Sequence, residues 1–572
     1  MSIKTFSLWL LSLQGVLSAA LPRNTSYTNP ILPGHHSDPS CISVGDTFYC
    51  VTSTFNLFPG LPIYASKDLI NWKHVSNALH REDQYSGYLQ IQGQQDGIYA
   101  PTLRHHDGIF YIIVAFQRLE ADGETGFDFL IFNSTDPYDP ESWDTPIVYN
   151  TPDLGSFDND IFFDDDGQAY VTVHVFDIVG VNQYPIDPST GEYGDNYNLW
   201  NGTGNIWPEG PHMYKKDGYY YLTLAEGGTG PNHQVTVARS EGNIRGPYEA
   251  YENNPILTNA NTTQYFQAVG HADIFQDQAG NWWATALSIR GGPDNQYYPM
   301  GRETVLTPVK WEEGGWPQPE PVRGHMTGPL LPPSRNVGGE QGVWLKDGDN
   351  YETFDGPSLP IHFIHYLFPP HNLYSFTDGR LQVNPTTQNL TGIESFDASS
   401  DQVALIARRQ TDTLFTYGVT MDFSPAAARE EAGITLFLSQ NQHADLGIVM
   451  LDGSPQVRFR ITGIGAVNPY ETETLVPLDP MLQDRPLRLE MQAVSETSYV
   501  FTYGADGNGG PLQTIGMTDA SLVSGGNGSF VGSYVGVYAS SNGGSGQTPA
   551  YYTKWMYEGQ GQMIDYNEMI ES

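Results

Sequence analysis

Basic residues are scarce in this sequence. Its 572 residues include 26 Lys and Arg against 65 Asp and Glu, which gives a formal net charge of -39. Charged residues make up only 16% of the chain, compared with about 25% in an average domain, so the acidity reflects a shortage of bases. Such a chain cannot neutralise phosphates, which excludes nucleic acid as a partner. Its 39% hydrophobic and 13% aromatic content excludes a disordered acidic segment.

Long apolar runs are absent after residues 1–20, so the sequence predicts no membrane span and no membrane partner. Residues 1–20 have the pattern of a secretory signal peptide: Lys4 supplies a positive charge, residues 6–17 are largely apolar, and the small residues Ser18 and Ala20 suit cleavage after Ala20. Six N-glycosylation sequons follow, at Asn24, Asn133, Asn201, Asn261, Asn389 and Asn527. The sequence therefore predicts a secreted, extracellular glycoprotein.

Cysteine is nearly absent. The two cysteines, Cys41 and Cys50, are too few for a redox or metal cluster. They flank Gly45-Asp46, a two-residue hairpin turn signal, and stand directly opposite each other across that hairpin. In an oxidising compartment this position favours a cross-strand disulfide. The alternative is a pair of buried thiols, and either role is structural.

Turn residues are abundant, with 61 Gly and 40 Pro. Five hairpin signals occur in the first half, each followed by an aromatic-rich strand: TFYCV, IFYIIV, QAYVTV, YYYLTL and NWWATAL. They recur about every 50 to 63 residues, a length that suits one four-stranded antiparallel blade. We therefore expect an all-β protein whose residues 27–320 form a five-bladed β-propeller.

The positions seven or eight residues before each turn predict where the chemistry lies. They are Asp38, Tyr99, Asp158, Glu209 and His271. In a propeller these positions begin the innermost strands, which converge on the central axis. Three carboxyl groups would then share one small volume, which is unfavourable unless one stays protonated while another is ionised.

A protonated and an ionised carboxyl group together are the equipment of glycoside hydrolysis. Asp38, in a polar turn, suits the general base that activates water, and Glu209 has the longer side chain needed to protonate a leaving oxygen. Asp158 suits a third group that raises the pKa of the acid, with Asp160 as its rival. Taken singly, Asp38 is equally typical of a turn and Glu209 of a surface acid. Calcium is a competing use of clustered carboxylates, but no EF-hand spacing is present.

Three further residues have both functional and structural interpretations. His271 is a candidate core histidine, metal ligand or sugar contact. Arg302 stands out among so few bases, either beside an active-site carboxylate or sugar, or in a salt bridge with Glu303. Phe55 follows the first hairpin and could stack on a sugar at a pocket rim, although most aromatics of such a chain serve packing.

These residues lie in motifs that resemble glycoside hydrolase family 43, in particular its two-domain β-xylosidases and α-L-arabinofuranosidases. The motifs cover the first domain in order: SDPS (37–40), STFNLFPG (53–60), IYASKDLINW (63–72), YAP (99–101), FDNDIFFDDDG (157–167), EGPHMYK (209–215), AEGGT (225–229), GHA (270–272) and GRET (301–304). Many bacterial members carry Trp where Tyr99 stands, and Pro or Ala where Asn159 stands. Both departures leave the preferred sugar open.

The resemblance implies a five-bladed propeller and inverting chemistry, with Asp38 as general base, Asp158 as pKa modulator and Glu209 as general acid. It implies that Phe55 and Arg302 contact the sugar of the -1 subsite. It implies that His271 lies near the axis, where some members hold calcium. No cofactor is required, and a structural calcium ion is an expectation only.

The second half predicts a different architecture. Residues 321–342 are rich in Pro and Gly and indicate a linker. Beyond it, strict alternation of apolar and polar residues at 456–461 and 487–493 is typical of half-buried antiparallel strands, so residues 343–572 should form a two-sheet β-sandwich. The resemblance, which includes AlaArgArg at 407–409, implies a concanavalin-like domain. This domain is either a lid that contributes one loop to the pocket rim or a sugar-binding module.

The leading functional hypothesis is an exo-acting enzyme that removes xylose or arabinofuranose from xylan- or arabinoxylan-derived saccharides. An arabinan-debranching arabinofuranosidase is an alternative. A fructosidase of related architecture expects an Asn-Asp-Pro-Asn-Gly start and a Glu-Cys motif, both absent here. A non-catalytic carbohydrate-binding propeller would not need three carboxyl groups. Neither the preference between the two pentoses nor the oligomeric state follows from the sequence.

Overall fold

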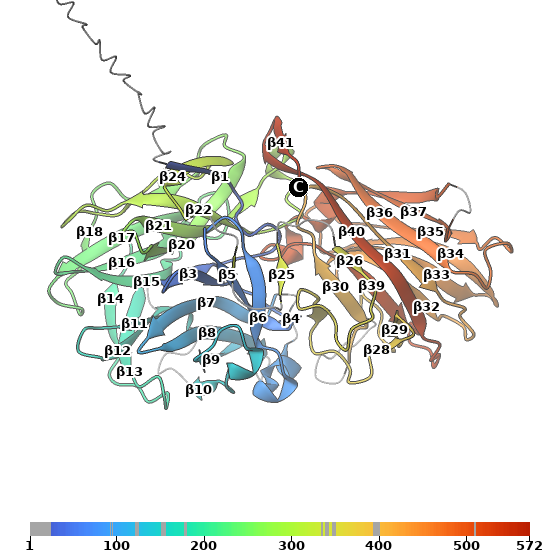
Figure 1. The fold of residues 1–572 in the computed structure, drawn as a ribbon, viewed down its shortest axis with the longest axis horizontal. Helices are drawn as coiled ribbons and strands as arrows, with labels where there is room; N and C mark the ends of the chain where they lie inside the picture. Colours follow the sequence, from blue (N-terminus) through green and yellow to red (C-terminus); the bar gives the residue numbers. More distant parts are fainter. Residues whose placement is uncertain are drawn as a thin grey trace, which may run out of the picture.

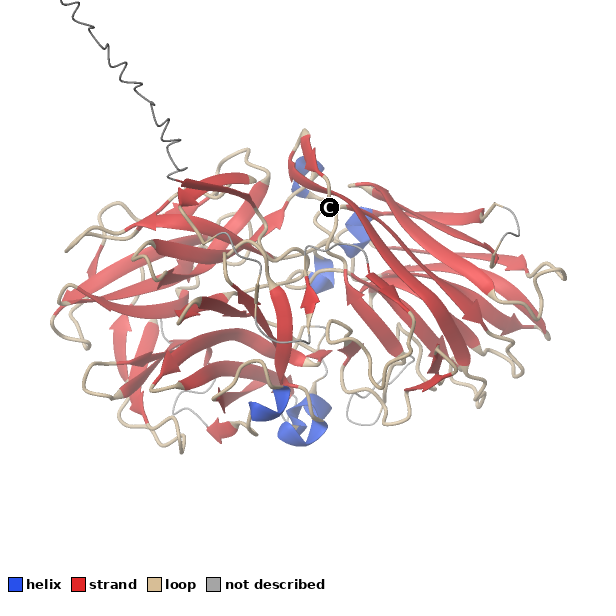
Figure 2. Cartoon of the chain, viewed as in Figure 1, coloured by secondary structure: helices blue, strands red, loops and turns tan. Residues whose placement is uncertain are grey.

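The structure is a computed structural model. It describes residues 24–91, 93, 95–119, 125–149, 156–176, 180–332, 336–337, 342–345, 350–392, 401–507 and 511–572. The predicted signal peptide, residues 1–20, lies outside the described residues. Almost all regular structure in the described part is β-strand (Figure 2). No helix in that part is long and apolar enough to cross a bilayer. The propeller and the concanavalin-like sandwich of the prediction lie side by side, with the propeller on the left of Figure 1.

Strands of the first domain form antiparallel sheets of four or five strands. The first contains β2 (Ser40–Val44), β3 (Thr47–Val51), β5 (Gly60–Ser66), β6 (Lys73–Leu79) and β25 (Val343–Trp344). The second contains β7 (Gly97–His106), β8 (Ile109–Leu119), β9 (Thr125–Ser134) and β10 (Ile147–Tyr149). The third contains β11 (Ser156–Phe163), β12 (Ala169–Val175), β13 (Val181–Ile186) and β14 (Tyr197–Trp200).

The remaining sheets of this domain follow the same plan. The fourth contains β15 (Glu209–Lys216), β16 (Tyr219–Glu226), β17 (Gln234–Glu241), β18 (Glu249–Ala250) and β19 (Leu257–Thr258). The fifth contains β20 (Phe266–Gln276), β21 (Trp282–Arg290), β22 (Glu303–Lys310) and β23 (Gln318–Pro319). Each of the aromatic-rich segments predicted after a hairpin turn lies in the second strand of its sheet.

The first strands of these sheets surround a common axis. Strand β2 contacts β7, β7 contacts β11, β11 contacts β15, β15 contacts β20, and β20 contacts β2 again, which closes a ring. This arrangement agrees with the expected five blades, although the blade count itself stays a prediction. Because the first strands converge, the residues at their N-terminal ends share one face of the propeller.

The predicted disulfide lies in the first sheet. Cys41 on β2 pairs directly with Cys50 on β3, and the two are joined by a disulfide bond. Both side chains are fully buried among aromatic residues such as Trp72 and Trp283. The bond therefore supports the hairpin that follows Asp38, and its role is structural.

Two small sheets connect distant parts of the chain. Strand β1 (Asn24–Thr28) pairs with β24 (His325–Pro329), which falls inside the predicted linker. Strand β4 (Leu57–Phe58) pairs with β27 (His365–Tyr366), which falls inside the predicted sandwich. Strand β25, at the predicted start of the sandwich, joins β6 of the propeller. The domain bounds stay predictions, but the chain between the two cores clearly packs on the propeller.

The second domain is a sandwich of two antiparallel sheets. The larger sheet contains β26 (Asn350–Glu352), β28 (Tyr374–Thr377), β29 (Arg380–Val383), β31 (Leu414–Asp422), β36 (Leu487–Ser495), β37 (Ser498–Ala505), β38 (Gln513–Asp519), β40 (Ala550–Asp565) and β41 (Glu568–Ile570). The smaller contains β30 (Leu405–Arg409), β32 (Glu431–Ser439), β33 (Gln442–Leu451), β34 (Ser454–Gly463), β35 (Tyr470–Pro477) and β39 (Tyr534–Ser540).

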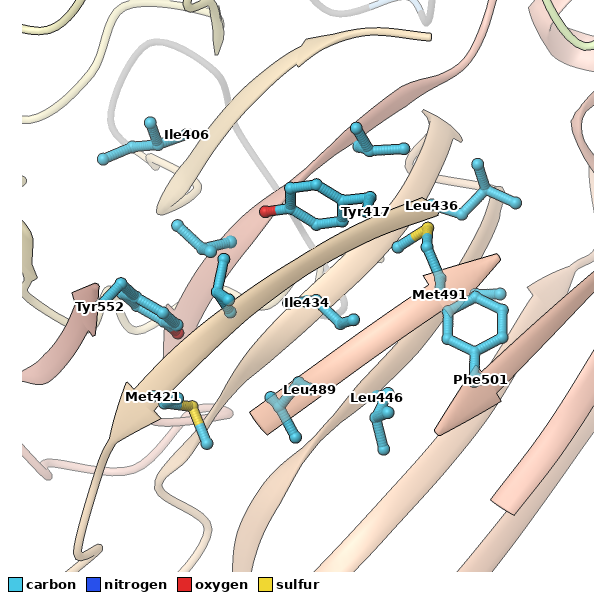
Figure 3. Packing of buried hydrophobic residues seen from close by; sticks show 14 of the residues in the cluster. Ile406, Tyr417, Met421, Ile434, Leu436, Leu446, Leu489, Met491, Phe501 and Tyr552 are labelled. Atoms are coloured by element: carbon cyan, nitrogen blue, oxygen red, sulfur yellow. The ribbon is translucent and has the colours of Figure 1, made fainter. Parts of the chain in front are cut away.

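The core of the sandwich lies between these sheets. Ile434, Leu436 and Leu446 from the smaller sheet face Tyr417, Leu489 and Met491 from the larger one (Figure 3). The predicted alternation at 456–461 lies in β34 and that at 487–493 in β36, as period-two burial requires.

Short 3₁₀-helices complete the described structure: η1 (Glu82–Gln84), η2 (Ser86–Gln90), η3 (Pro140–Ser142), η4 (Pro293–Asn295), η5 (Ala520–Val523) and η6 (Gly526–Gly528). The last two matter for function, because η5 and η6 belong to the sandwich and precede a loop that reaches the propeller face.

Candidate active site

Each first strand has a kinked residue at an equivalent place in the repeat, either just before the strand, as for β2, or within it. These residues have positive φ, with values of 50° at Asp38, 38° at Ala100, 57° at Asp158, 55° at Gly210 and 47° at His271. Strand β20 has a second such residue, Ala268, with a φ of 52°. The ladder to the second strand shifts register at the kinks in β7, β11, β15 and β20. A bulge of this kind turns a side chain away from the sheet, and such strain is concentrated at functional sites.

The kinked positions show which of the predicted residues are equivalent in the repeat. Asp38, Asp158 and His271 occupy the kinked position itself, whereas Tyr99 and Glu209 stand one residue earlier. Asp38 and Asp158 are thus true equivalents in the repeat, and Glu209 approaches the axis from a different backbone position. This offset fits a distinct role for the longer Glu side chain.

All seven residues predicted to bind or transform substrate line a single pocket of about 350 Å³. They are Asp38, Phe55, Tyr99, Asp158, Glu209, His271 and Arg302. The pocket lies at the N-terminal ends of the first strands, on the propeller axis. The structure therefore brings together side chains that lie far apart in the sequence.

Asp38 is held in its ionised form. Its Oδ2 accepts a hydrogen bond of 2.6 Å from the Ser53 hydroxyl, and its Oδ1 lies 3.7 Å from a guanidinium nitrogen of Arg302. Burial alone would raise the pKa of Asp38, but His271, Arg302 and the hydroxyl contact outweigh burial and lower it. Because His271 is itself neutral above about pH 4, Arg302 is the cation that acts near neutral pH.

Asp158 and Glu209 have the opposite tendency. Both are nearly inaccessible, and burial is the largest cause that raises their pKa values. Each also feels the negative charge of Asp38, and Asp158 feels that of Glu209. Two carboxyl groups this close cannot both ionise easily, so they retain a proton between them. The backbone N–H of Gly210 donates to Asp158 over 2.9 Å, which favours charge on Asp158 and the proton on Glu209.

His271 lies between the two aspartates. Its Nδ1 is 3.8 Å from Asp38 and 3.9 Å from Asp158, and burial lowers its pKa to about 4. The ring is therefore neutral near pH 7 and lines the pocket, and its role as a core histidine or a sugar contact stays a prediction. Gly210 makes room for the ring, because a Cβ there would lie 3.0 Å from the His271 ring.

Arg302 does not form the alternative salt bridge with Glu303. Glu303 pairs instead with Arg290, at 2.6 and 2.8 Å, on the far side of the strand. Arg302 faces Asp38, and its guanidinium stacks 4.4 Å above the ring of Phe530. The pocket thus has one fixed positive charge beside its most acidic carboxylate.

A loop of the sandwich completes the pocket. Phe530, which follows η6, lies between Arg302 and Phe55, with its ring 6.1 Å from that of Phe55. Phe55 is 1% exposed and also packs edge-on against Tyr99 at 5.0 Å, so it forms a buried wall of the pocket. The expected contribution of one sandwich loop is observed, but nothing in the local sequence around Phe530 distinguishes it.

The opposite wall is an aromatic cluster that sequence reasoning missed. It contains Phe127, Phe157, Phe176 and Trp207. Phe176 and Trp207 are 46% and 47% exposed and meet edge to face at 6.0 Å. Large exposed rings beside a polar pocket are suited to stacking on sugar faces. Trp207 could have been predicted from the sequence as a pocket residue, because it stands two residues before Glu209.

The rival carboxylate Asp160 lies deeper on the axis and does not line the pocket. It accepts a hydrogen bond of 2.7 Å from Arg104, whose guanidinium also donates to Asp273 at 2.7 Å and to Ser40 at 3.2 Å. These partners each stand two residues after a kinked position. Arg104 also donates to the ring of His212 on β15 over 3.2 Å. This residue, which the sequence analysis did not single out, therefore ties the other four first strands to its own.

The axial residues do not fit the expected calcium ion. The buried carboxylates Asp160 and Asp273 both already pair with the cation Arg104, and the positive charge of Arg302 acts on His271. Among the described residues, no group of three or more His, Cys, Asp or Glu could hold a metal ion. His271 as a metal ligand has no support, and no step below involves a metal.

Comparisons with known proteins agree with this geometry. Residues 27–317 match the profile described as glycosyl hydrolases family 43, and residues 351–558 match the beta xylosidase C-terminal concanavalin A-like domain. The chain belongs to glycosyl hydrolase family 43. Members of this family are glycosidases, and so is this protein.

Relatives of known activity span nearly the whole chain. A non-reducing end alpha-L-arabinofuranosidase of Bacteroides ovatus is 34% identical over 542 residues, which cover 92% of this chain and 93% of the relative. A xylosidase/arabinosidase of Humicola insolens is 31% identical and covers 90% and 94%. The solved structure of a family 43 protein from Bacillus licheniformis has a TM-score of 0.81 and 29% identity, and covers 93% of this chain and 100% of its own.

Proposed function

We propose that this family 43 glycosidase is secreted and removes terminal xylose or arabinofuranose residues from xylan and arabinoxylan, with inversion at the anomeric carbon. Similarity to relatives described as xylosidases and arabinofuranosidases supports hemicellulose as the substrate class. The predicted signal peptide and sequons support secretion.

One observation carries the mechanism: carboxyl groups in one pocket have pKa values displaced in opposite directions. Asp38, lowered, is the general base that takes a proton from the attacking water. Glu209, raised, is the general acid that gives its proton to the glycosidic oxygen as the bond to the anomeric carbon breaks. Asp158 keeps Glu209 protonated through its charge.

The walls of the pocket support exo action. Phe55, Arg302 and Phe530 close one side with buried or stacked side chains, whereas the aromatic cluster with Trp207 is open to solvent. A terminal sugar would enter the closed side and the remainder of the saccharide would lie along the open one. Arg302 and Tyr99 would donate hydrogen bonds to hydroxyl groups of that terminal sugar.

Rates on aryl β-xyloside and aryl α-arabinofuranoside, followed by rates on singly and doubly substituted arabinoxylan, test the substrate assignment. We expect turnover of at least one of the two aryl pentosides. Following the first-formed anomer by NMR tests inversion. A product that first appears with retained configuration would reject Asp38 as the base that activates water.

Substitution separates the two roles. Asp38→Asn should reduce kcat about 100-fold or more on every substrate, because water activation is always needed. Glu209→Gln should cost as much on xylobiose but much less on an aryl glycoside with a good leaving group, which needs little protonation. If both variants lose activity equally on both substrates, the assignment of acid and base is wrong.

Secretion is tested separately from catalysis. Expression of the full chain in a eukaryotic secretory host should yield protein in the medium that begins at Leu21 and becomes smaller after glycan removal. An N-terminus that still contains Lys4, or protein confined to cells, would contradict this part of the proposal without affecting the chemistry.

A further inference from the structure

The interface between the two domains encloses a second, smaller cavity of about 50 Å³. Its polar lining comes from both domains: His36, Tyr64 and His74 from the propeller, and Arg408, Arg409 and Thr411 from the sandwich. A single water needs ~10–15 Å³ measured in this way. The cavity therefore has room for a few waters or for one small polyatomic ion.

Two arginines bring positive charge into this cavity. Arg408 and Arg409 end strand β30 and are 8% and 6% exposed. Arg409 donates from Nε to the backbone oxygen of His35 over 2.8 Å. Arg408 donates to the Arg409 carbonyl and to the Thr411 hydroxyl, each over 3.2 Å, and stacks 3.8 Å from the Tyr557 ring. Neither guanidinium forms an ion pair with a carboxylate among the described residues.

The other polar groups of the lining, among the residues that the structure describes, are Tyr64, Thr411 and the rings of His36, His74 and His362. The ring nitrogens of His36 form hydrogen bonds with the Tyr64 hydroxyl and the Gly34 carbonyl. Burial and the positive charge of Arg409 hold the pKa of His36 well below its usual value. Burial and Arg409 also lower the pKa of His74 to about 3. These rings are neutral near pH 7 and present no anion.

Burial lowers the pKa of Arg408, and the charges of Asp412 and Glu352 attract its guanidinium and partly offset this effect. Among the described residues neither carboxylate forms an ion pair with Arg408. The two oxygens of Asp412 accept from the Thr411 hydroxyl at 2.8 Å and from Gln562 at 2.7 Å. Two buried guanidinium groups without a paired anion are unfavourable. In a chain with a net charge of -39, such a pair indicates a ligand of opposite charge.

We propose that this cavity binds a small oxyanion of the phosphate or sulfate class. The guanidinium N–H groups for which the described residues offer no acceptor match the tetrahedral oxygens of such an ion, which planar guanidinium groups bind in pairs. The ion would join β30 of the sandwich to the segment His35–His36, which lies just before Asp38. The site is separate from the sugar pocket and does not depend on the proposed substrate.

Thermal unfolding of the full chain, purified without phosphate or sulfate, tests the proposal. Phosphate should raise Tm in a saturable manner, on the order of 2 °C, relative to chloride at equal ionic strength. Arg409→Met should abolish the saturable rise. Arg239→Met is the matched control, because that guanidinium stacks on the surface rings of Tyr219 and Trp316, and it should keep the rise.

An increase in Tm that is equal in wild type and Arg409→Met, or that grows linearly with phosphate without saturation, would be a general solvent effect. Either result would overturn the proposed site. A second measurement does not depend on a folded variant. Crystals of the wild-type protein soaked in selenate should show an anomalous peak between Arg408 and Arg409. Only water or a halide in that cavity at high selenate would also overturn the proposal.

Discussion

At the scale of single residues, the ionisation of Asp38 depends on a few contacts in a buried pocket. Ser53 is the closest of them, and its hydroxyl also accepts the backbone N–H of Ala100 over 2.8 Å. The hydroxyl therefore links the base to the kink of the neighbouring first strand. A charge-assisted hydrogen bond of this length favours the charged form of the acceptor.

Ser53→Ala should raise the pKa of Asp38, because it removes a donor that stabilises the carboxylate. The acid limb of the profile of kcat/KM against pH should move upward by about one pH unit. Ser43→Ala, on the partly exposed side of the same sheet, is the control and should leave the limb in place. An unchanged acid limb in Ser53→Ala would mean that Arg302 alone sets this pKa.

Asp158→Asn should move the opposite limb. Removal of its negative charge lowers the pKa of Glu209, so the general acid loses its proton at lower pH and the alkaline limb moves downward. Activity near neutral pH should then fall more than activity near pH 5. The surface substitution Asp187→Asn is the control. If Asp158→Asn lowers the plateau without moving the limb, Asp158 positions the substrate and does not modulate the acid.

The polar members of the site could be predicted from sequence because they recur at one place in a repeat. Asp38 and Asp158 share the kinked position, and Glu209 is offset from it by one residue. The offset did not hide Glu209, because the residues were located only by a distance of seven or eight positions from the following hairpin turn. Phe530 could not be predicted in this way. Its place beside Phe55 results from the packing of two domains, and no local pattern near residue 530 encodes that contact.

At the scale of elements, the first strands of the propeller are joined by one buried cation. Arg104 on β7 contacts the other four first strands, β2, β11, β15 and β20, through Ser40, Asp160, His212 and Asp273. This network lies two residues along each strand from the kinked positions. It fixes the spacing of the strands whose kinked residues converge on the pocket.

Arg104→Met should destabilise the protein by about 3–5 kcal/mol, because it leaves two carboxylates buried without their partner. The measurement is the denaturant midpoint of the full chain, with Arg245→Met at an exposed stacking position as control.

Since Arg104 already supplies positive charge on the axis, prolonged dialysis against EDTA should leave wild-type activity unchanged. A loss of activity that calcium restores would show that the axial carboxylates need a cation in addition to Arg104.

The strands themselves were predictable where the signal is local. Turn residues followed by aromatic strands indicated the hairpins from β2–β3 to β20–β21, because each needs only neighbouring residues to form. Pairings between distant segments were not predictable. Strand β25 adds to the edge of β6, and β24 pairs with β1, through backbone hydrogen bonds that carry no side-chain pattern.

At the scale of the whole molecule, the two domains share one functional surface. Arg290 of the propeller pairs with Glu303 and also donates to Thr413 and to the backbone oxygen of Met563 in the sandwich. This buried tie holds the sandwich in the position from which Phe530 reaches the pocket. The second domain therefore supplies part of the pocket lining.

Phe530→Ala should reduce kcat/KM about 10-fold without unfolding the protein, because it opens the wall beside Arg302 and removes an aromatic contact. Met517→Ala, at a position of the sandwich that is 57% exposed, is the control for general effects on that domain. Unaltered kinetics in Phe530→Ala would show that the loop covers the pocket without contacting the substrate.

The position of strand β40 in the sheet affects the order in which the protein can fold during its synthesis. It spans Ala550–Asp565, yet it lies between β29 and β31 in the larger sheet of the sandwich. A ribosome delivers the chain from its N-terminus, so the propeller and its carboxyl groups emerge long before this central strand. Until β40 arrives, the sheet has a gap at its middle and the sandwich cannot hold Phe530 in place. The nascent chain thus possesses the carboxyl groups proposed as acid and base early, and completes the lining of the pocket only when synthesis is almost finished.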